Sequence, residues 1–211
     1  MEFCSGGDLK RYCSTRKVTE EMALNIIKQL SRGFEEMSKL GIIHRDLKPA
    51  NILVHQDAFK ICDFGFAKLF GEAGKMARTF VGTPIYMSPQ VLSQKHYTSK
   101  TDVWSLGVMF FELLFKRLPY NGYTEQDLFK NIMGKPLNIP ECSKESRQLL
   151  LGMLVIEEAN RWTWDEVFEN IHGKSPNRKV NTPSNAAGGI FYANEQKPRD
   201  KSLEERQPRV I

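Results

Sequence analysis

The sequence has few cysteines, no long apolar run and no charged segment followed by an apolar one at its start. The four cysteines are Cys4, Cys13, Cys62 and Cys142. None belongs to a C-x-x-C pair, which argues against a disulfide scaffold and favours free thiols in a reducing compartment. The longest apolar-rich run, residues 103–115, is too short to span a bilayer and predicts a buried helix. We expect no signal peptide and no membrane span, and the expected location is the cytoplasm, with the nucleus as the alternative.

The sequence also lacks a strong charge over most of its length. The formal net charge is +5, but residues 173–211 hold eight Lys or Arg and only four Asp or Glu. The 22 basic and 21 acidic residues of positions 1–172 nearly cancel. Because this body offers no net basic field to a phosphate backbone, we expect no nucleic-acid partner.

Composition divides the chain at about residue 172. Apolar residues make up 41% and charged residues 26% of the whole, a balance typical of a globular domain. From residue 173 onward, proline, glycine and asparagine replace large apolar residues. We therefore expect a folded domain over 1–172 and a basic, disordered tail over 173–211.

Helical periodicity dominates the body. Residues 19–40 place apolar side chains at steps of three and four, with Thr19 suited to the N-cap and Gly41 to the position after the helix. Further helices are expected over 101–115, 125–133, 144–155 and 164–171. Residues 51–54 and 59–62 predict two short strands joined by a turn. The body is thus expected to be mainly α with one small hairpin.

The chemistry of the chain is concentrated after the first long helix. Residues 44–51 read His-Arg-Asp-Leu-Lys-Pro-Ala-Asn, and Asp63-Phe64-Gly65 follows the predicted hairpin. Two carboxylates and an amide oxygen, from Asp46, Asp63 and Asn51, are oxygen donors suited to Mg²⁺ that also binds phosphates. Lys48 adds a cation that would neutralise phosphate charge. This combination is typical of phosphoryl transfer, where positioning and charge stabilisation dominate.

These motifs resemble those of the protein kinase family. The resemblance implies that Asp46 is the base that orients a substrate hydroxyl and that Lys48 steadies the γ-phosphate of ATP. Asn51 and Asp63 would hold Mg²⁺. Lys48 two residues after Asp46, together with Thr83 in the substrate-facing loop, is the serine/threonine-specific pattern. Thr83 is expected to contact the catalytic Asp and Lys.

Later landmarks follow the family order. Residues 82–90 resemble the loop that closes the activation segment, residues 102–107 the start of the buried helix, and Arg161 the arginine before the last helix. The resemblance implies that His44 and Phe64 stack in the regulatory spine and that Asp102 anchors the His44 backbone. Residues 82–89 and 97–100 show a weak similarity to the autophagy-initiating kinase group.

The start of the chain is similar to the hinge between the kinase lobes. Five residues would then contact the nucleotide: Met1 at the gatekeeper position, Glu2 and Cys4 at the adenine through their backbones, Asp8 at the ribose and Leu53 under the adenine. Cofactors implied by the resemblance are ATP and Mg²⁺. The implied partner is a protein that presents a serine or threonine.

A regulatory threonine is expected in the activation segment. Thr79 lies three residues before Gly82, where many of these kinases are phosphorylated, and Arg45 and Lys68 are the cations expected to bind its phosphate. A phosphate would draw the two cations together and order the segment. This implies an upstream activating kinase, and a plain solvated threonine is the alternative.

The resemblance covers only the large lobe of a protein kinase-like α+β fold. The 211 residues contain no glycine-rich phosphate loop, strand lysine or αC glutamate, so the small ATP-binding lobe is missing and the chain alone is expected to be inactive. Gln90 replaces the usual glutamate and is expected to hydrogen-bond Arg161 without the charge. Ala50 replaces a glutamate that binds arginine-containing substrates. Two functions stay open, the catalytic lobe of a serine/threonine kinase and a non-catalytic binding or scaffold module.

Overall fold

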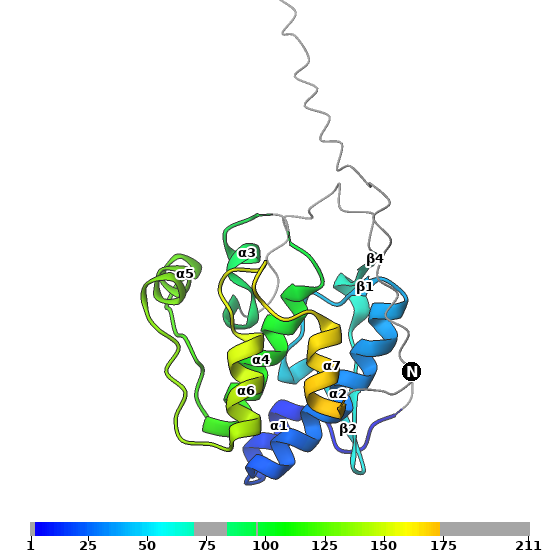
Figure 1. Ribbon diagram of the computed structural model, residues 1–211. Coiled ribbons are helices and arrows are strands. Elements are labelled where there is room, and N and C mark those ends of the chain that lie inside the picture. The colour runs from blue at the N-terminus through cyan, green and yellow to red at the C-terminus, as the bar shows by residue number, and fades with distance from the viewer. Residues whose placement is uncertain (1–2, 70–83, 96, 174–211) are drawn as a thin grey trace, which may run out of the picture. The chain divides into compact units, whose positions relative to one another are not determined.

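The computed structural model describes residues 3–69, 84–95 and 97–173, without the side chains of Phe66, Lys68 and Leu69. Contacts divide the chain into one compact unit over Met1–Pro176 and a second over Asn177–Ile211, and the second lies outside the described residues. The disorder expected for the tail is therefore untested. Within the described part, seven α-helices pack together, and two small two-stranded sheets lie beside them (Figure 1).

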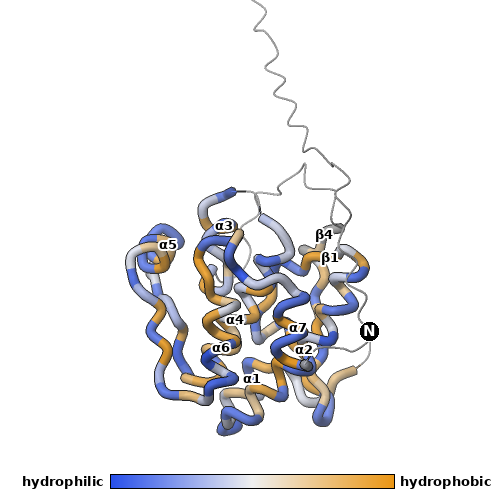
Figure 2. Tube along the Cα trace, viewed as in Figure 1, coloured by the Kyte–Doolittle hydropathy of each residue, from blue (hydrophilic) through white to orange (hydrophobic). Residues whose placement is uncertain are grey.

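The longest helix, α2 (Glu20–Lys39), begins and ends where its sequence predicts. The Thr19 side chain accepts a hydrogen bond from the Met22 backbone N–H (3.2 Å), and Glu20 and Glu21 lie at the positive end of the helix dipole. Gly41 takes a φ of 67° after the last turn, a conformation that glycine adopts without strain. Polar and apolar residues alternate along the helix (Figure 2), and its apolar side packs on α4 and α7.

Helix α4 (Lys100–Phe115) forms the centre of the core. Its side chains are buried on nearly every face, including Trp104, Phe110 and Phe111, and it contacts α2, α6 (Lys144–Met153) and α7 (Trp164–His172). Gly107 allows α6 to approach closely, since a Cβ at this position would lie 2.9 Å from the Met153 Cβ. The predicted central helix is thus confirmed, with one residue added at its start.

The predicted hairpin is confirmed as β2 (Ile52–His55) and β3 (Ala58–Ile61). The strands pair antiparallel with Ile52 opposite Ile61 and His55 opposite Ala58. Gln56, in the turn, takes a φ of 54°. A second sheet that the sequence did not predict pairs β1 (Ile42–Ile43) with β4 (Lys68–Leu69).

The remaining elements frame the two loops that carry the candidate site. Helix α1 (Leu9–Thr15), which was not predicted, begins at the N-cap Asp8, and α5 (Glu125–Gly134) lies at the edge of the lobe beside α3 (Pro89–Leu92) (Figure 1). Three short 3₁₀ helices are η1 (Pro49–Asn51), η2 (Phe64–Phe66) and η3 (Pro84–Tyr86). No helix in the described ranges combines the length and apolar character needed to cross a membrane.

Candidate active site

Asp102 holds the loop between α2 and η1 in place. This buried carboxylate, in the first turn of α4, accepts hydrogen bonds from the backbone N–H groups of His44 (2.7 Å) and Arg45 (2.9 Å). Burial raises the pKa of Asp102, and the two N–H donors oppose that shift. Arg45 has a φ of 70°, an unfavourable conformation for its side chain, and the two bonds fix it there. The predicted contact of Asp102 with the His44 backbone is confirmed.

Three candidate catalytic side chains meet at the end of this loop. Lys48 Nζ donates to Asp46 Oδ2 (2.7 Å), and Asn51 Nδ2 donates to the same oxygen (2.9 Å) and to the Asp46 carbonyl (2.8 Å). Asp46 and Lys48 are largely shielded from solvent, and Asn51 is buried. Among the described residues no donor reaches Asp46 Oδ1, which therefore stays open to a ligand.

His44 joins this loop to the segment that carries Asp63. Its Nδ1 accepts a hydrogen bond from the Asp46 backbone N–H (3.3 Å), so its Nε2 carries the proton and donates it to the Cys62 carbonyl (3.0 Å). The Cys62 backbone N–H in turn donates to the Asn51 carbonyl (2.9 Å). These two hydrogen bonds join Cys62, the residue before Asp63, to His44 and Asn51. They thereby hold Asp63 near the cluster of Asp46 and Asn51.

Asp63 begins η2 with a left-handed backbone. Its φ is 63°, and its Oδ1 accepts a hydrogen bond from the Gly65 N–H (3.4 Å), while the side chain is exposed. The rings of His44 and Phe64 lie 5.4 Å apart at 56°, so they are in contact but tilted and not stacked as predicted. Ring packing at this angle still links the two motifs.

The N-terminal segment lies beside β2, where the nucleotide residues are expected. Gly6 N–H donates to the Val54 carbonyl (2.9 Å), Val54 N–H donates to the Gly7 carbonyl (2.8 Å), and Asp8 bridges to Leu53. These contacts bring Asp8 and Leu53 together, while Met1 and Glu2 lie outside the described residues.

Asp8 and Cys4 have surroundings that the sequence did not reveal. Asp8 Oδ1 accepts the Arg11 N–H (2.8 Å) as the cap of α1, so only its second oxygen is available to a sugar. Burial raises the pKa of the Cys62 thiol, and the nearby Asp63, Cys4 and Asp8 raise it further. Cys62 therefore lies near enough to both the N-terminal segment and Asp63 to be affected by their charges.

The predicted phosphate clamp falls mostly outside the described residues. Thr79 and Thr83 lie there, as does the Lys68 side chain, although the Lys68 backbone belongs to β4. Arg45 donates from Nη1 to the Tyr97 hydroxyl (3.3 Å). The grouping of Arg45 and Lys68 around Thr79 therefore stays a prediction.

Arg161 lies buried between α3 and the start of α4. It is 1% exposed and donates to Gln90 Oε1 (2.9 Å) and to three backbone carbonyls, those of Lys100, Val155 and Ile156. Burial lowers the pKa of Arg161 to about 10. The hydrogen bond expected between Gln90 and Arg161 is confirmed, and Gln90 Nε2 also donates to the Ile156 carbonyl (2.8 Å).

Tyr86 and Glu112 form a contact that sequence reasoning missed. The Tyr86 hydroxyl donates to Glu112 Oε2 (2.6 Å), joining η3 to α4. Burial raises the pKa of Tyr86 above its ordinary value, and Glu112 raises it further. No spacing rule connects residues 26 positions apart, so only the three-dimensional structure reveals this pair.

The donor set fits a magnesium ion that is shared with phosphates. Asn51 keeps its Oδ1 free because its Nδ2 makes both bonds to Asp46, and Asp63 has one carboxylate oxygen beyond the Gly65 contact. No cluster of three or more His, Cys, Asp or Glu occurs in the described part of the chain, so a metal held by such side chains alone is not supported there. Mg²⁺ commonly binds a few protein oxygens together with substrate phosphates.

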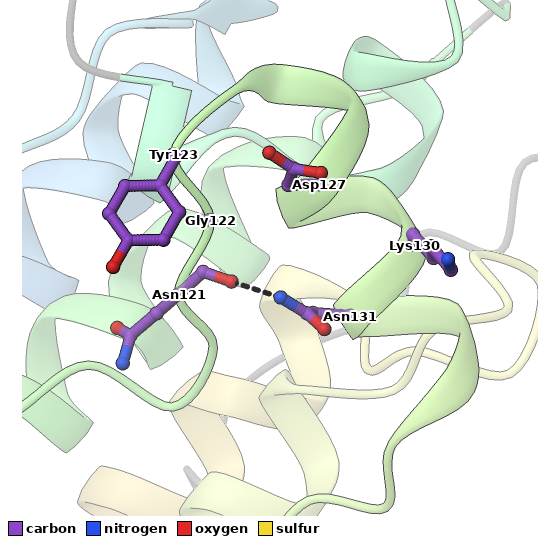
Figure 3. A pocket seen from close by; sticks show the side chains of 6 residues that line it. All are labelled: Asn121, Gly122, Tyr123, Asp127, Lys130 and Asn131. Atoms are coloured by element: carbon purple, nitrogen blue, oxygen red, sulfur yellow. Dashed lines mark hydrogen bonds between the residues drawn. The ribbon is translucent and has the colours of Figure 1, made fainter.

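A separate hollow lies beside α5, away from these residues. Its volume is about 500 Å³, and it is lined by Tyr123, Asp127, Lys130 and the 121–122 and 131 positions (Figure 3). The Asn131 amide crosses it to donate to the Asn121 carbonyl (2.6 Å). The hollow contains none of the predicted site residues.

Comparison with known proteins places these observations in a family. The protein kinase domain family matches residues 1–171. The serine/threonine-protein kinase Atg1 of Dictyostelium discoideum is 39% identical over 176 residues, 81% of this chain and 26% of that protein. Human ULK1 is 36% identical (81% and 18%), and human Nek2 is 34% identical (81% and 41%). The chain thus spans about a quarter of the Dictyostelium relative. The chain belongs to the protein kinase family and is a homologue of the serine/threonine kinases of the Atg1/ULK group.

Proposed function

We propose that this chain supplies the catalytic lobe of a serine/threonine protein kinase, which transfers the γ-phosphate of ATP to a hydroxyl of a protein. The observation that carries the proposal is the double hydrogen bond to Asp46 Oδ2 from Lys48 and Asn51. A carboxylate held in this way has one orientation, which is what a positioned base requires.

Asp46 is the proposed base for the substrate hydroxyl. Both donors use Oδ2, so Oδ1 is the oxygen left to accept the hydroxyl hydrogen and to aim the oxygen atom. Lys48 lies 2.7 Å from the same carboxylate, which places a cation beside the reacting group. That cation would stabilise negative charge on the transferring phosphoryl group. Thr83 is proposed to complete this cluster.

Asn51 and Asp63 are the proposed magnesium ligands, through Asn51 Oδ1 and the Asp63 carboxylate. When bound, Mg²⁺ would neutralise charge on the phosphates of ATP. The chain's contribution is to hold the two oxygen donors together, through the Cys62 to Asn51 and His44 to Cys62 hydrogen bonds. Both bonds use backbone atoms of Cys62, so a different side chain at this position would leave the two oxygen donors together.

The nucleotide base and ribose are proposed to lie against residues 4–8 and β2. The Asp8 bridge to Leu53 brings a carboxylate and an apolar surface to one place, as a ribose and an adenine require. Met1, Glu2 and Cys4 would line the same side. A phosphorylated Thr79, bound by Arg45 and Lys68, is proposed to activate the enzyme after modification by an upstream kinase.

Phosphate transfer from radiolabelled ATP to a serine-containing protein tests the proposal. The 211-residue chain is compared with the same chain fused at Met1 to the small lobe of the Dictyostelium relative. We expect transfer by the fusion and none by the chain alone, because the 211 residues contain no glycine-rich loop to cover the phosphates.

Variants of the fusion separate catalysis from folding. Asp46→Asn should lower kcat by about 10² to 10⁴, the range expected for a lost general base, with little change in the affinity for magnesium-ATP. Asp57→Asn, which alters an exposed carboxylate in the β2–β3 turn, should leave kcat unchanged. A folded, nucleotide-binding fusion that transfers no phosphate would instead support the binding-module alternative.

A further inference from the structure

A small hollow beside the N-terminal segment is lined by two arginines, Arg11 and Arg16. Its volume is about 260 Å³, and it lies between α1 and the turn after β2. The polar and aromatic residues that line it are Ser5, Arg11, Tyr12, Thr15, Arg16 and Gln56. None of the residues assigned to catalysis or to magnesium lines it. Ser5, Gly6 and Val54 belong to the segments against which the nucleotide is proposed to lie, so the hollow borders the proposed nucleotide site.

The wall of this hollow is held by packing and backbone hydrogen bonds. Gly6 pairs with Val54 through a 2.9 Å hydrogen bond, and a Cβ at Gly6 would lie 2.7 Å from the Val54 carbonyl oxygen, so this close approach of the two segments requires glycine. The Tyr12 ring packs edge-on against Phe59, with centroids 5.6 Å apart. The Arg16 guanidinium lies 4.7 Å above the Tyr12 ring, which fixes one arginine over an aromatic wall.

The two arginines have no acidic partner within the residues that the structure describes. Neither Arg11 nor Arg16 takes part in an ion pair there. The nearest acid along the helix, Asp8, already accepts the Arg11 backbone N–H. Lys10 and Lys17 lie on the same segment, so it is locally basic although the domain as a whole is nearly neutral.

One hydroxyl group, that of Ser5, completes the set of donors in the hollow. The Thr15 hydroxyl donates to the backbone carbonyl groups of residues 11 and 12 and is not available to a ligand. The Ser5 hydroxyl has no hydrogen-bond partner in the described ranges and lines the hollow. Two guanidinium groups and one free hydroxyl are suited to a tetrahedral oxyanion, because arginine pairs with phosphate oxygens through two parallel hydrogen bonds.

We infer that this hollow binds the phosphate group of a phosphorylated serine or threonine in a protein segment that docks beside α1. A phosphomonoester carries a charge of about −2 and three acceptor oxygens, which matches two cations and a hydroxyl better than a single carboxylate would. The exposed residues of α1 are polar or charged, and in the adjoining described segment Phe3, 82% exposed, is a single large apolar side chain, too little apolar surface to hold a bilayer. A peptide therefore fits better than a lipid headgroup.

Isothermal titration of the 211-residue chain tests this inference. The probe is a short glycine- and alanine-based peptide with one phosphoserine, and the comparators are the unphosphorylated peptide, inorganic phosphate, and phosphatidylcholine vesicles that contain a phosphoinositide. We expect saturable binding of the phosphopeptide that weakens with added salt. Equal affinity for inorganic phosphate, binding to vesicles alone, or no binding of the phosphopeptide would overturn the proposal.

Matched variants distinguish a built site from general positive charge. Arg11→Gln/Arg16→Gln should weaken phosphopeptide binding about tenfold or more, since two charge-assisted hydrogen bonds are lost. Lys10→Gln/Lys17→Gln removes the same charge from the same segment but no residue that lines the hollow, and should have a much smaller effect. Equal losses in the two double variants would show diffuse attraction and contradict the inference.

A charge-preserving variant guards against a folding artefact. Arg11→Lys/Arg16→Lys keeps both cations and loses the planar guanidinium fork, so binding should weaken although the net charge is unchanged. Undiminished affinity in this variant would refute the site as described. Asp46→Asn should leave phosphopeptide binding as it is, so failure of this inference and failure of the proposed kinase function are separate results.

Discussion

At the scale of single residues, buried polar groups fix the loops on which the proposed chemistry depends. Asp102 receives two backbone N–H bonds, and they hold Arg45 in a conformation that its side chain disfavours. Asn51 gives both of its amide hydrogens to Asp46. Removing either polar group would leave partners buried and unsatisfied, which costs more than the bond itself contributes.

Tyr86 gives a residue-scale prediction about pH. Tyr86→Phe should lower the free energy of unfolding by about 1–3 kcal/mol near neutral pH, because Glu112 loses its donor. The folded protein raises the pKa of Tyr86, so this contribution is present below the ordinary tyrosine pKa and declines as the pH rises above it. Urea denaturation of both proteins at pH values below and above about 10 measures the difference.

Tyr123→Phe is the matched control for that measurement. The Tyr123 side chain is fully exposed, so removal of its hydroxyl should leave the unfolding free energy unchanged at both pH values. A gap between wild type and Tyr86→Phe that widens as the pH rises would contradict the assigned pKa direction.

Single residues also show which parts of the candidate site could be predicted from the sequence and which could not. Adjacent motif residues such as Asp46, Lys48 and Asn51 were predicted together, because a short turn stiffened by proline holds them close. Tyr86 and Glu112 belong to separate elements, and no local pattern relates them. The proximity of Cys62 to the N-terminal segment likewise depends on tertiary packing and had no signal in the sequence.

At the scale of elements, the contact between α4 and α6 gives a test of close packing. Gly107→Ala should lower the unfolding free energy by about 1–2 kcal/mol, since overpacking outweighs the gain in helix propensity. The new Cβ would meet the Met153 Cβ at 2.9 Å, an atom next to the backbone that has little freedom to move. Chemical denaturation of the variant measures this loss.

Gly134→Ala provides the opposite expectation on another helix. No atom lies within 4 Å of a Cβ built at Gly134, the last residue of α5. The alanine should raise the unfolding free energy by up to about 1 kcal/mol through propensity alone. Loss of stability in this variant, or none at Gly107→Ala, would show that the close approach is not what requires glycine.

Element prediction succeeded where periodicity and caps agreed. Helix α2 has both a threonine cap and a long amphipathic repeat, and α5 and α7 begin with capping boxes at Thr124 and Thr163. Helix α1 is only seven residues long, and β1 and β4 have two residues each. Such short elements carry too few residues for a period to show, and partners far along the chain decide their pairing.

At the scale of the whole molecule, one helix organises both the core and the site. Helix α4 contributes Asp102 to the catalytic loop and Glu112 to Tyr86, and Arg161 donates to the carbonyl of its first residue, Lys100. The same helix is buried on nearly all faces. Stability and the proposed active-site geometry are therefore coupled, and core substitutions along α4 should impair both together.

The boundary near residue 172 leads to a prediction about the stability of the whole chain. The family match ends at residue 171, and α7 ends at His172 with Gly173 as its C-cap. Within the part of the chain that the structure describes, the core residues lie before that point. A chain that ends at Gly173 should therefore have the thermal unfolding midpoint of the 211-residue chain, measured by circular dichroism under identical conditions. A midpoint lowered by several degrees would show that residues 174–211 contribute to folding, because about 1 kcal/mol shifts the midpoint of a domain this size by about 2–4 °C.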